Sequence, residues 1–197
     1  MKKRIFLIKT IFCLLLCSGL ANASIYGYPF TDRHVATVLG TPPEFAAVVP
    51  KDIPTKTANI KMFPERKVPG VLFPMDVLYY SYQRQDGPAP LIFLIAGTGA
   101  SFKSLKMIDM QRAFYHAGFN VVSLSSPTHP NFIAAGSTSG VPGHLEEDSA
   151  DLYNVMKAVW QKLQNEMNVT EFYLTGYSLG AAQSAFVAKL DEQEKAF

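Results

Sequence analysis

The second half of the chain alternates between apolar runs and amphipathic segments. Residues 91–96 are apolar throughout, which predicts a central strand covered on both faces of a sheet. The next segment has apolar residues at three- and four-residue steps and ends at Gly118, which predicts a helix. Strands at 119–124 and 169–175 and helices at 144–167 and 179–190 follow in the same way. This order predicts right-handed crossovers and a mostly parallel sheet, the α/β fold class.

The first 23 residues have the three parts of a secretory signal peptide. Residues 1–4 are basic, residues 5–16 are mostly apolar, and Ala21, Asn22 and Ala23 form a small-x-small cleavage site. The apolar run is too short to span a membrane comfortably, so we expect no membrane span after cleavage. Export predicts a bacterial periplasmic or secreted protein.

Loss of this segment changes the charge balance. The chain has 18 basic and 16 acidic residues, and the segment carries four of the basic residues and no acidic one, leaving 14 against 16. No basic cluster remains that would indicate nucleic-acid binding. Cys13 and Cys17 also lie in this segment. The sequence therefore predicts no disulfide, no cysteine metal site and no cofactor site in the mature protein.

Residues 24–75 form a proline-rich extension ahead of the domain at 76–197. Dense proline excludes long helices and favours extended backbone. We expect short strands at 59–63 and 71–73, with the extension packed on the domain through three aromatic residues, Tyr26, Tyr28 and Phe30. Residues 77–83 are β-rich and predict a half-buried strand.

A serine between two glycines follows the last predicted strand. The segment Gly-Tyr-Ser-Leu-Gly at 176–180 matches the G-x-S-x-G nucleophile elbow, in which a tight turn exposes a serine hydroxyl at the start of a helix. The turn is tight enough to require glycine on both sides of it. Loops leaving the strands at Gly97, Ser125 and Gly176 are expected at one sheet edge, where open α/β sheets bind ligands.

Serine chemistry needs a base for the hydroxyl proton and donors for the oxyanion. The backbone N–H of Leu179 and the small-residue loop at 97–99 are candidate donors. With these motifs, residues 76–190 resemble the α/β-hydrolase family, and Ala96 stands where the family's oxyanion loop often has histidine. The resemblance implies an esterase- or lipase-like enzyme that cleaves a small or lipid-like acyl substrate (an ester, thioester or amide). It also implies roles for seven residues: Ser178 as nucleophile, Leu179 and Thr98 as oxyanion amides, and Gly97, Gly99, Gly176 and Gly180 as turn supports.

The family's acid and histidine follow the nucleophile, and this part of the pattern is missing. No histidine follows Ser178 in this sequence, and the acidic residues that follow it are Asp191, Glu192 and Glu194. We therefore expect a truncated chain that lacks the last strands, is inactive by itself and is poorly soluble because a sheet edge stays open. The alternative is a hydrolase-like binding protein that has no triad. Neither the substrate nor the oligomeric state follows from the sequence.

Of the four histidines, His129 is the candidate for contact with substrate, because its loop leaves a strand at the edge where Ser178 lies. We interpret His144 as a cap or surface group, and His116 as a helix-end residue. Asp148 and Asp151 are expected to be helix-start and surface charges.

Overall fold

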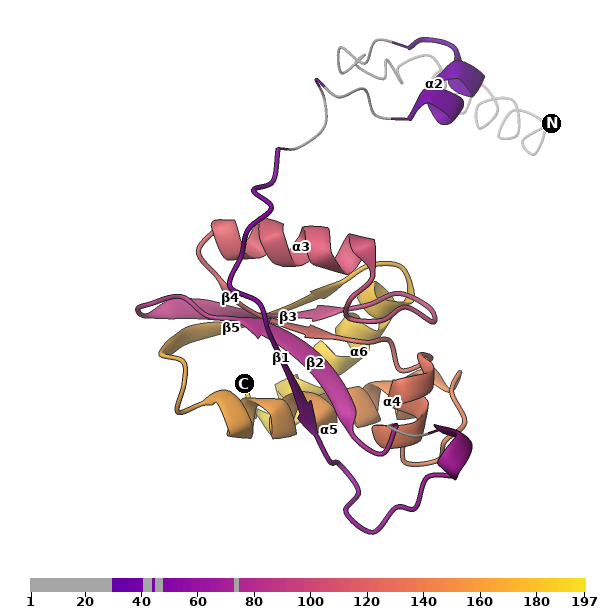
Figure 1. The fold of residues 1–197 in the computed structure, drawn as a ribbon, viewed down its shortest axis with the longest axis vertical. Coiled ribbons are helices and arrows are strands. Elements are labelled where there is room, and N and C mark those ends of the chain that lie inside the picture. The colour runs from indigo at the N-terminus through magenta and orange to yellow at the C-terminus, as the bar shows by residue number, and fades with distance from the viewer. Residues whose placement is uncertain (1–29, 41–43, 45–47, 73–74) are drawn as a thin grey trace, which may run out of the picture. The chain divides into compact units, whose positions relative to one another are not determined.

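The computed structural model describes residues 30–40, 44, 48–72 and 75–197 (Figure 1). The predicted signal peptide, Tyr26 and Tyr28 lie outside the described residues. The chain divides into two compact units, Met1–Ala47 and Val48–Phe197. In the first unit, helix α2 (Arg33–Leu39) begins after Asp32, whose carboxylate accepts hydrogen bonds from the next helical amides. The second unit contains the sheet and the elbow.

The described part of the second unit has a five-stranded sheet in the order β1-β2-β4-β3-β5. Its strands are β1 (Lys56–Ile60), β2 (Leu78–Gln83), β3 (Ala89–Ile95), β4 (Asn120–Leu124) and β5 (Val169–Gly176). Strand β3 is parallel to both β4 and β5, whereas β2 is antiparallel to β1 and β4. The predicted α/β class and its mostly parallel second half are confirmed.

The proline-rich extension contributes to this sheet. Strand β1 lies slightly before the strand expected at 59–63 and pairs with β2, so the sheet begins ahead of residue 76. The strand expected at 71–73 is wrong where the structure describes it, because Gly70–Leu72 is the short 3-10 helix η2. Val71 within η2 is 90% exposed, so its side chain is not buried against the sheet.

Helices cover both faces of the sheet (Figure 1). Helix α3 (Leu105–His116) packs on one face, and α5 (Leu145–Leu163) and α6 (Leu179–Glu194) pack on the other. Helix α4 (Pro130–Ala135) lies in the segment that leaves the strand ending at Leu124, and its six residues are too few to show helical periodicity in the sequence. None of the helices in the described ranges is long and apolar enough to cross a membrane.

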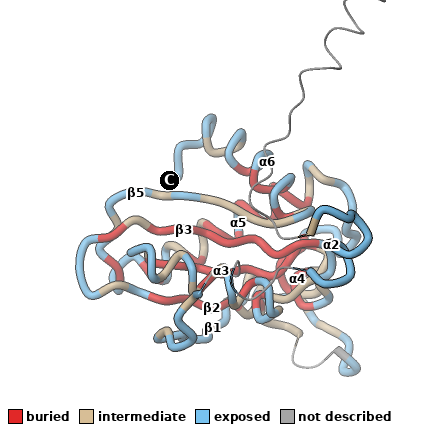
Figure 2. The backbone as a smooth tube through the Cα atoms, turned by 90° about the horizontal axis from the view of Figure 1, so that it is seen from above, coloured by how far each residue is buried: buried red, intermediate tan, exposed pale blue. Residues whose placement is uncertain are grey.

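The alternation of side chains along β3 explains why its sequence is apolar throughout. Leu91, Phe93 and Ile95 belong to the core cluster that contains α5 and α6 residues, whereas Ile92 and Leu94 belong to the cluster that contains α3 residues. Figure 2 shows β3 buried along most of its length, whereas the residues of β5 are intermediate or exposed, and Tyr173 on β5 is 45% exposed. Strand β5 pairs only with β3 among the described residues.

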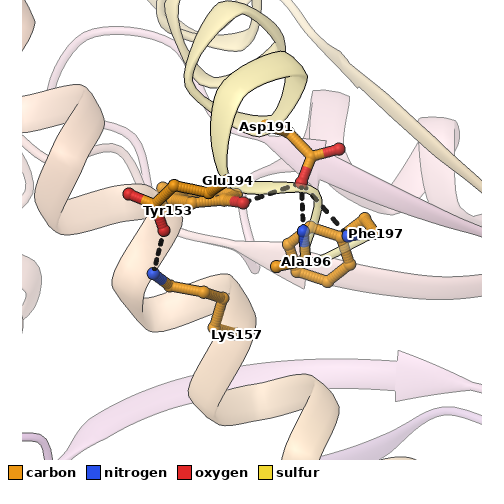
Figure 3. A network of polar contacts seen from close by, with 6 residues as sticks. All are labelled: Tyr153, Lys157, Asp191, Glu194, Ala196 and Phe197. Carbon is orange, nitrogen blue, oxygen red and sulfur yellow. Dashed lines mark hydrogen bonds and ion pairs between the residues drawn. The ribbon is translucent and has the colours of Figure 1, made fainter.

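A polar network joins α5 to the end of α6 (Figure 3). The Asp191 carboxylate accepts hydrogen bonds from the Tyr153 hydroxyl at 2.7 Å and from the amides of Ala196 and Phe197 at 3.0 and 3.1 Å. Burial, together with the hydrogen bond to Asp191, raises the pKa of Tyr153 to about 12. The Phe197 ring makes edge contacts with Phe93, Tyr153 and Phe172. Asp191 therefore links α6 and the residues that follow it to α5.

Candidate active site

The predicted elbow connects β5 to α6. Strand β5 ends at Gly176 and α6 begins at Leu179, so Ser178 lies in the turn between them. Ser178 has φ 53° and ψ −126°, a combination that L-residues rarely adopt, and Lys195 is the only other non-glycine residue in the described ranges with positive φ. Such strain persists only where the surrounding structure enforces it, and it is concentrated at functional sites.

Close packing explains why glycine flanks the serine. A Cβ at Gly180 would overlap the carbonyl oxygen of Ile95 and lie 2.6 Å from that of Ala96. A Cβ at Gly176 would lie 2.6 Å from the carbonyl group of Gly180 and 2.8 Å from the Ile95 oxygen. Neither glycine has positive φ, so both are required for space and not for backbone freedom.

The Ser178 side chain is exposed at the head of α6. In the described part of the chain its hydroxyl has no hydrogen-bond partner, and neither has the backbone N–H of Leu179. The next two backbone amides of the helix already form hydrogen bonds: the Gly180 N–H donates to the Tyr177 carbonyl, and the Ala181 N–H donates to the Ser178 carbonyl. Among the described residues the Leu179 amide is therefore available to donate to a ligand at the helix N-terminus.

The carboxyl ends of β3, β4 and β5 lie side by side at one edge of the sheet, as expected. Ile95 at the end of β3 pairs with both Leu124 of β4 and Gly176 of β5. The glycine loop (residues 97–100) that follows β3 lies directly against the elbow. A Cβ at Gly97 would lie 2.6 Å from the Tyr177 ring and 3.1 Å from the Ser178 Cβ.

Two backbone amides of the glycine loop already donate hydrogen bonds within the protein. The Gly99 N–H donates to the Thr128 Oγ1 at 2.7 Å, and the Ala100 N–H donates to the Gly97 carbonyl at 2.9 Å. Thr98 is exposed, and its N–H has no partner within the described residues. Within the described residues, the amides of Thr98 and Leu179, which the resemblance implied as oxyanion donors, are thus both unpaired.

His129 is half-buried and is the N-cap residue directly before α4. Its Nδ1 accepts a hydrogen bond from the Asn131 N–H at 3.2 Å, so the proton of the neutral ring is on Nε2. Burial lowers the pKa of His129 below its ordinary value of 6.5. The ring makes no hydrogen bond to Ser178 in the described part of the chain, and its contact with substrate stays a prediction.

The lowered pKa of His129 predicts a specific pH dependence of stability. Above pH 6.5 the ring is neutral in both states and its contribution is complete. As the pH falls from 6.5 toward the lower folded-state pKa, the unfolded chain binds the proton first and stability is lost. In His129→Asn, which keeps a capping acceptor, this loss should be absent. Urea unfolding at pH values from 8 to 5 measures the difference, and parallel profiles for the two proteins would contradict the assignment.

Asp148 lies in the first turn of α5, so its expected place at a helix start is confirmed. The expectation that Asp148 and Asp151 are surface charges is wrong, because the two residues are only 4% and 3% exposed. Asp148 accepts a hydrogen bond from the Gly143 N–H at 2.9 Å, and Asp151 accepts from the Thr138 N–H at 2.8 Å. The loop after α4 lacks regular structure, so its amides need acceptors, which these carboxylates supply.

Other polar residues at the helix ends have structural roles. His144 caps α5 as expected, its Nδ1 accepting from the Glu147 N–H. Asp191 lies 13 residues along α6 from Ser178, or about 20 Å at the rise of an α-helix, so it does not reach the serine.

Sequence reasoning missed the long-range contacts of two residues. Thr128 contacts the glycine loop, and Arg66 from the extension donates to the carbonyls of Ala134 and Ser137 at 3.1 and 2.6 Å. The sequence could have indicated a role for Thr128, because a hydroxyl residue follows the end of a strand there. No sequence pattern indicates the role of Arg66, because its partners are backbone carbonyls far along the chain.

Comparison with known proteins gave structural likenesses only. No protein-family model matches the chain, and the search of curated proteins found no match. The chain is similar to TT1662 from Thermus thermophilus, with 18% identity and a TM-score of 0.43 over 71% of this chain and 52% of that one. It is also similar to esterase B from Lactobacillus rhamnosis, in a structure with a tributyrin phosphonate inhibitor, with 16% identity and a TM-score of 0.43 over 72% and 45% of the two chains.

A Pyrobaculum calidifontis esterase gives 19% identity and a TM-score of 0.40 over 74% of this chain and 42% of that one. The chain thus spans about half the length of these structures. Its own α/β sheet, with a strained serine between a strand and a helix, is the arrangement that the resemblance of the motifs to α/β-hydrolases implied.

Proposed function

We propose that the chain carries the nucleophile and oxyanion hole of an exported serine hydrolase of the α/β-hydrolase type. The enzyme cleaves an ester, thioester or amide of a small or lipid-like acyl substrate through an acyl-enzyme on Ser178. The observation that carries this proposal is the backbone of Ser178, which is strained and holds an exposed hydroxyl at a helix N-terminus. Export is a further part of the proposal and is supported by the pattern of residues 1–23.

The chemistry follows from the groups around the hydroxyl. The Ser178 Oγ bonds to the acyl carbon, and the carbonyl electron pair moves to its oxygen, where the N–H groups of Leu179 and Thr98 donate to the negative charge. Collapse of this intermediate breaks the bond to the leaving group, which departs with the proton that the Ser178 Oγ lost when it bonded to the acyl carbon. Water then attacks the acyl-enzyme and releases the acid.

A second candidate function is binding without catalysis. Serine attack requires a base for the Oγ proton. Among the described residues no side chain makes a hydrogen bond to the Ser178 hydroxyl. This observation favours an exported hydrolase-like module that binds a partner through the same edge of the sheet.

Pre-steady-state hydrolysis of p-nitrophenyl esters separates the two functions. The natural protein, produced from its whole gene, is mixed with esters of short and long acyl chains in a stopped-flow instrument. The hydrolase should release about one equivalent of p-nitrophenol in a burst, followed by slower turnover, because acylation of Ser178 precedes hydrolysis. A folded protein with neither burst nor turnover would rule out the hydrolase for these esters and favour the binding module.

A further inference from the structure

A pair of hydroxyl groups in the loop after β4 holds the glycine loop. The Thr128 Oγ1 accepts a hydrogen bond from the Gly99 N–H at 2.7 Å and lies 2.9 Å from the Ser126 Oγ. The same two loops are joined again where the Ser126 N–H donates to the Ala100 carbonyl at 3.0 Å. Ser126 is fully buried and Thr128 is half-buried, so this connection lies partly beneath the surface.

The glycine loop needs such a support because its own side chains cannot fix it. Gly97 and Gly99 have no side chains, and Gly99 has φ +66°, a conformation open to glycine at little cost. The peptide planes of the loop are therefore set by their hydrogen bonds. Thr128 binds the Gly99 amide and thereby restrains the adjoining residue Thr98, whose N–H stays unpaired in the described structure.

We propose that Thr128 is a positioning residue that aims the Thr98 amide at the oxyanion. This inference rests on the proposed function, because it concerns how the oxyanion hole of that reaction is held. The β-branched side chain of threonine restricts its rotamers, and the buried Ser126 hydroxyl holds the Thr128 oxygen in place. An oxyanion donor is effective only when its geometry is fixed before the reaction.

Three variants of the natural protein test this role. Thr128→Val keeps the shape of the side chain and removes the acceptor for the Gly99 N–H, whereas Thr128→Ser keeps a hydroxyl. Thr138→Val is the matched control, because it removes a loop hydroxyl whose partner is Asp151, at 3.2 Å, and not an amide of the glycine loop. Each protein is assayed for kcat and KM with a p-nitrophenyl ester.

Thr128→Val should lower kcat about tenfold to hundredfold with KM nearly unchanged, because a misplaced oxyanion donor weakens binding of the transition state alone. Thr128→Ser should recover most of the rate, and Thr138→Val should match the wild type. Wild-type kcat in Thr128→Val would overturn the proposal. If that variant does not fold, the Thr128→Ser rate is compared with that of Ser126→Ala, which removes the second hydroxyl of the pair and should lower kcat while leaving KM unchanged; an unchanged kcat there would also overturn it.

Hydrogen exchange of the Gly99 amide supplies a readout that needs no turnover. Loss of its acceptor in Thr128→Val should speed exchange in the peptide that covers residues 97–102 and leave the control unchanged. Unchanged exchange in an active protein overturns the role of Thr128 and leaves the proposed function standing. A different result overturns the proposed function: the Gly99 amide is protected in the wild type and exchanges faster in Thr128→Val, but the wild type hydrolyses no ester. In that case Thr128 has no role in catalysis.

Discussion

Replacing Gly180 with alanine should destabilise the folded protein severely. The new Cβ would meet the backbone carbonyl oxygens of Ile95 and Ala96, and backbone atoms at the end of a central strand cannot move aside as a flexible side chain can. Strand β3 is paired on both sides, so any shift there disturbs β4 and β5 as well. We expect a loss of about 4 kcal/mol or more, a large share of the stability of a typical domain. Urea unfolding followed by circular dichroism measures this loss.

Gly87→Ala is the matched control for this experiment. A Cβ at Gly87 would meet no atom within 4 Å, and the residue does not have positive φ, so alanine there should change the free energy of unfolding by less than about 0.5 kcal/mol. Equal unfolding midpoints for Gly180→Ala and the wild type would contradict the close approach of α6 to β3.

Ser178→Ala should reduce ester hydrolysis by the natural protein by about 10⁴-fold or more, because no acyl-enzyme forms without the hydroxyl. The fold should be unaffected, since that hydroxyl has no hydrogen-bond partner in the described structure. Measurement of kcat/KM together with a thermal melt separates the two effects. Residual turnover near the wild-type rate would show that the hydrolytic centre lies elsewhere.

Ser178→Gly removes the same hydroxyl and also the strained Cβ. Because positive φ costs glycine little, this variant should be more stable than Ser178→Ala by about 1 kcal/mol, after the greater flexibility of glycine in the unfolded chain is included. Equal stability of the two variants would indicate that the elbow is not strained in solution.

The sequence predicted the elements whose pattern is long or repeated. The apolar run of β3 and the periodic stripe of α5 each indicate one structure, because both result from burial against a large neighbouring surface. The elbow was predictable for a different reason. Glycine is needed on both sides of the serine because a Cβ there would overlap backbone atoms of the elbow itself or of the end of β3. Sequence motifs capture such local requirements well.

The remaining features depend on partners far away in the chain. Helix α4 is too short to be periodic, and the burial of Asp151 depends on the Thr138 amide 13 residues earlier. Thr128 acquires its role through Gly99, 29 residues before it. Because a polar side chain in a loop has the same local pattern whether it is solvated or buried against such a partner, these contacts could not be derived from the sequence.

The most direct test of the central claim is to find which residue of the folded natural protein reacts with a fluorophosphonate probe. The probe phosphonylates an activated serine and remains attached, so peptide mass spectrometry identifies the site. Our account predicts one adduct, on the peptide that contains Ser178, and its loss in Ser178→Ala. An adduct on another serine, or none on folded protein, would contradict it.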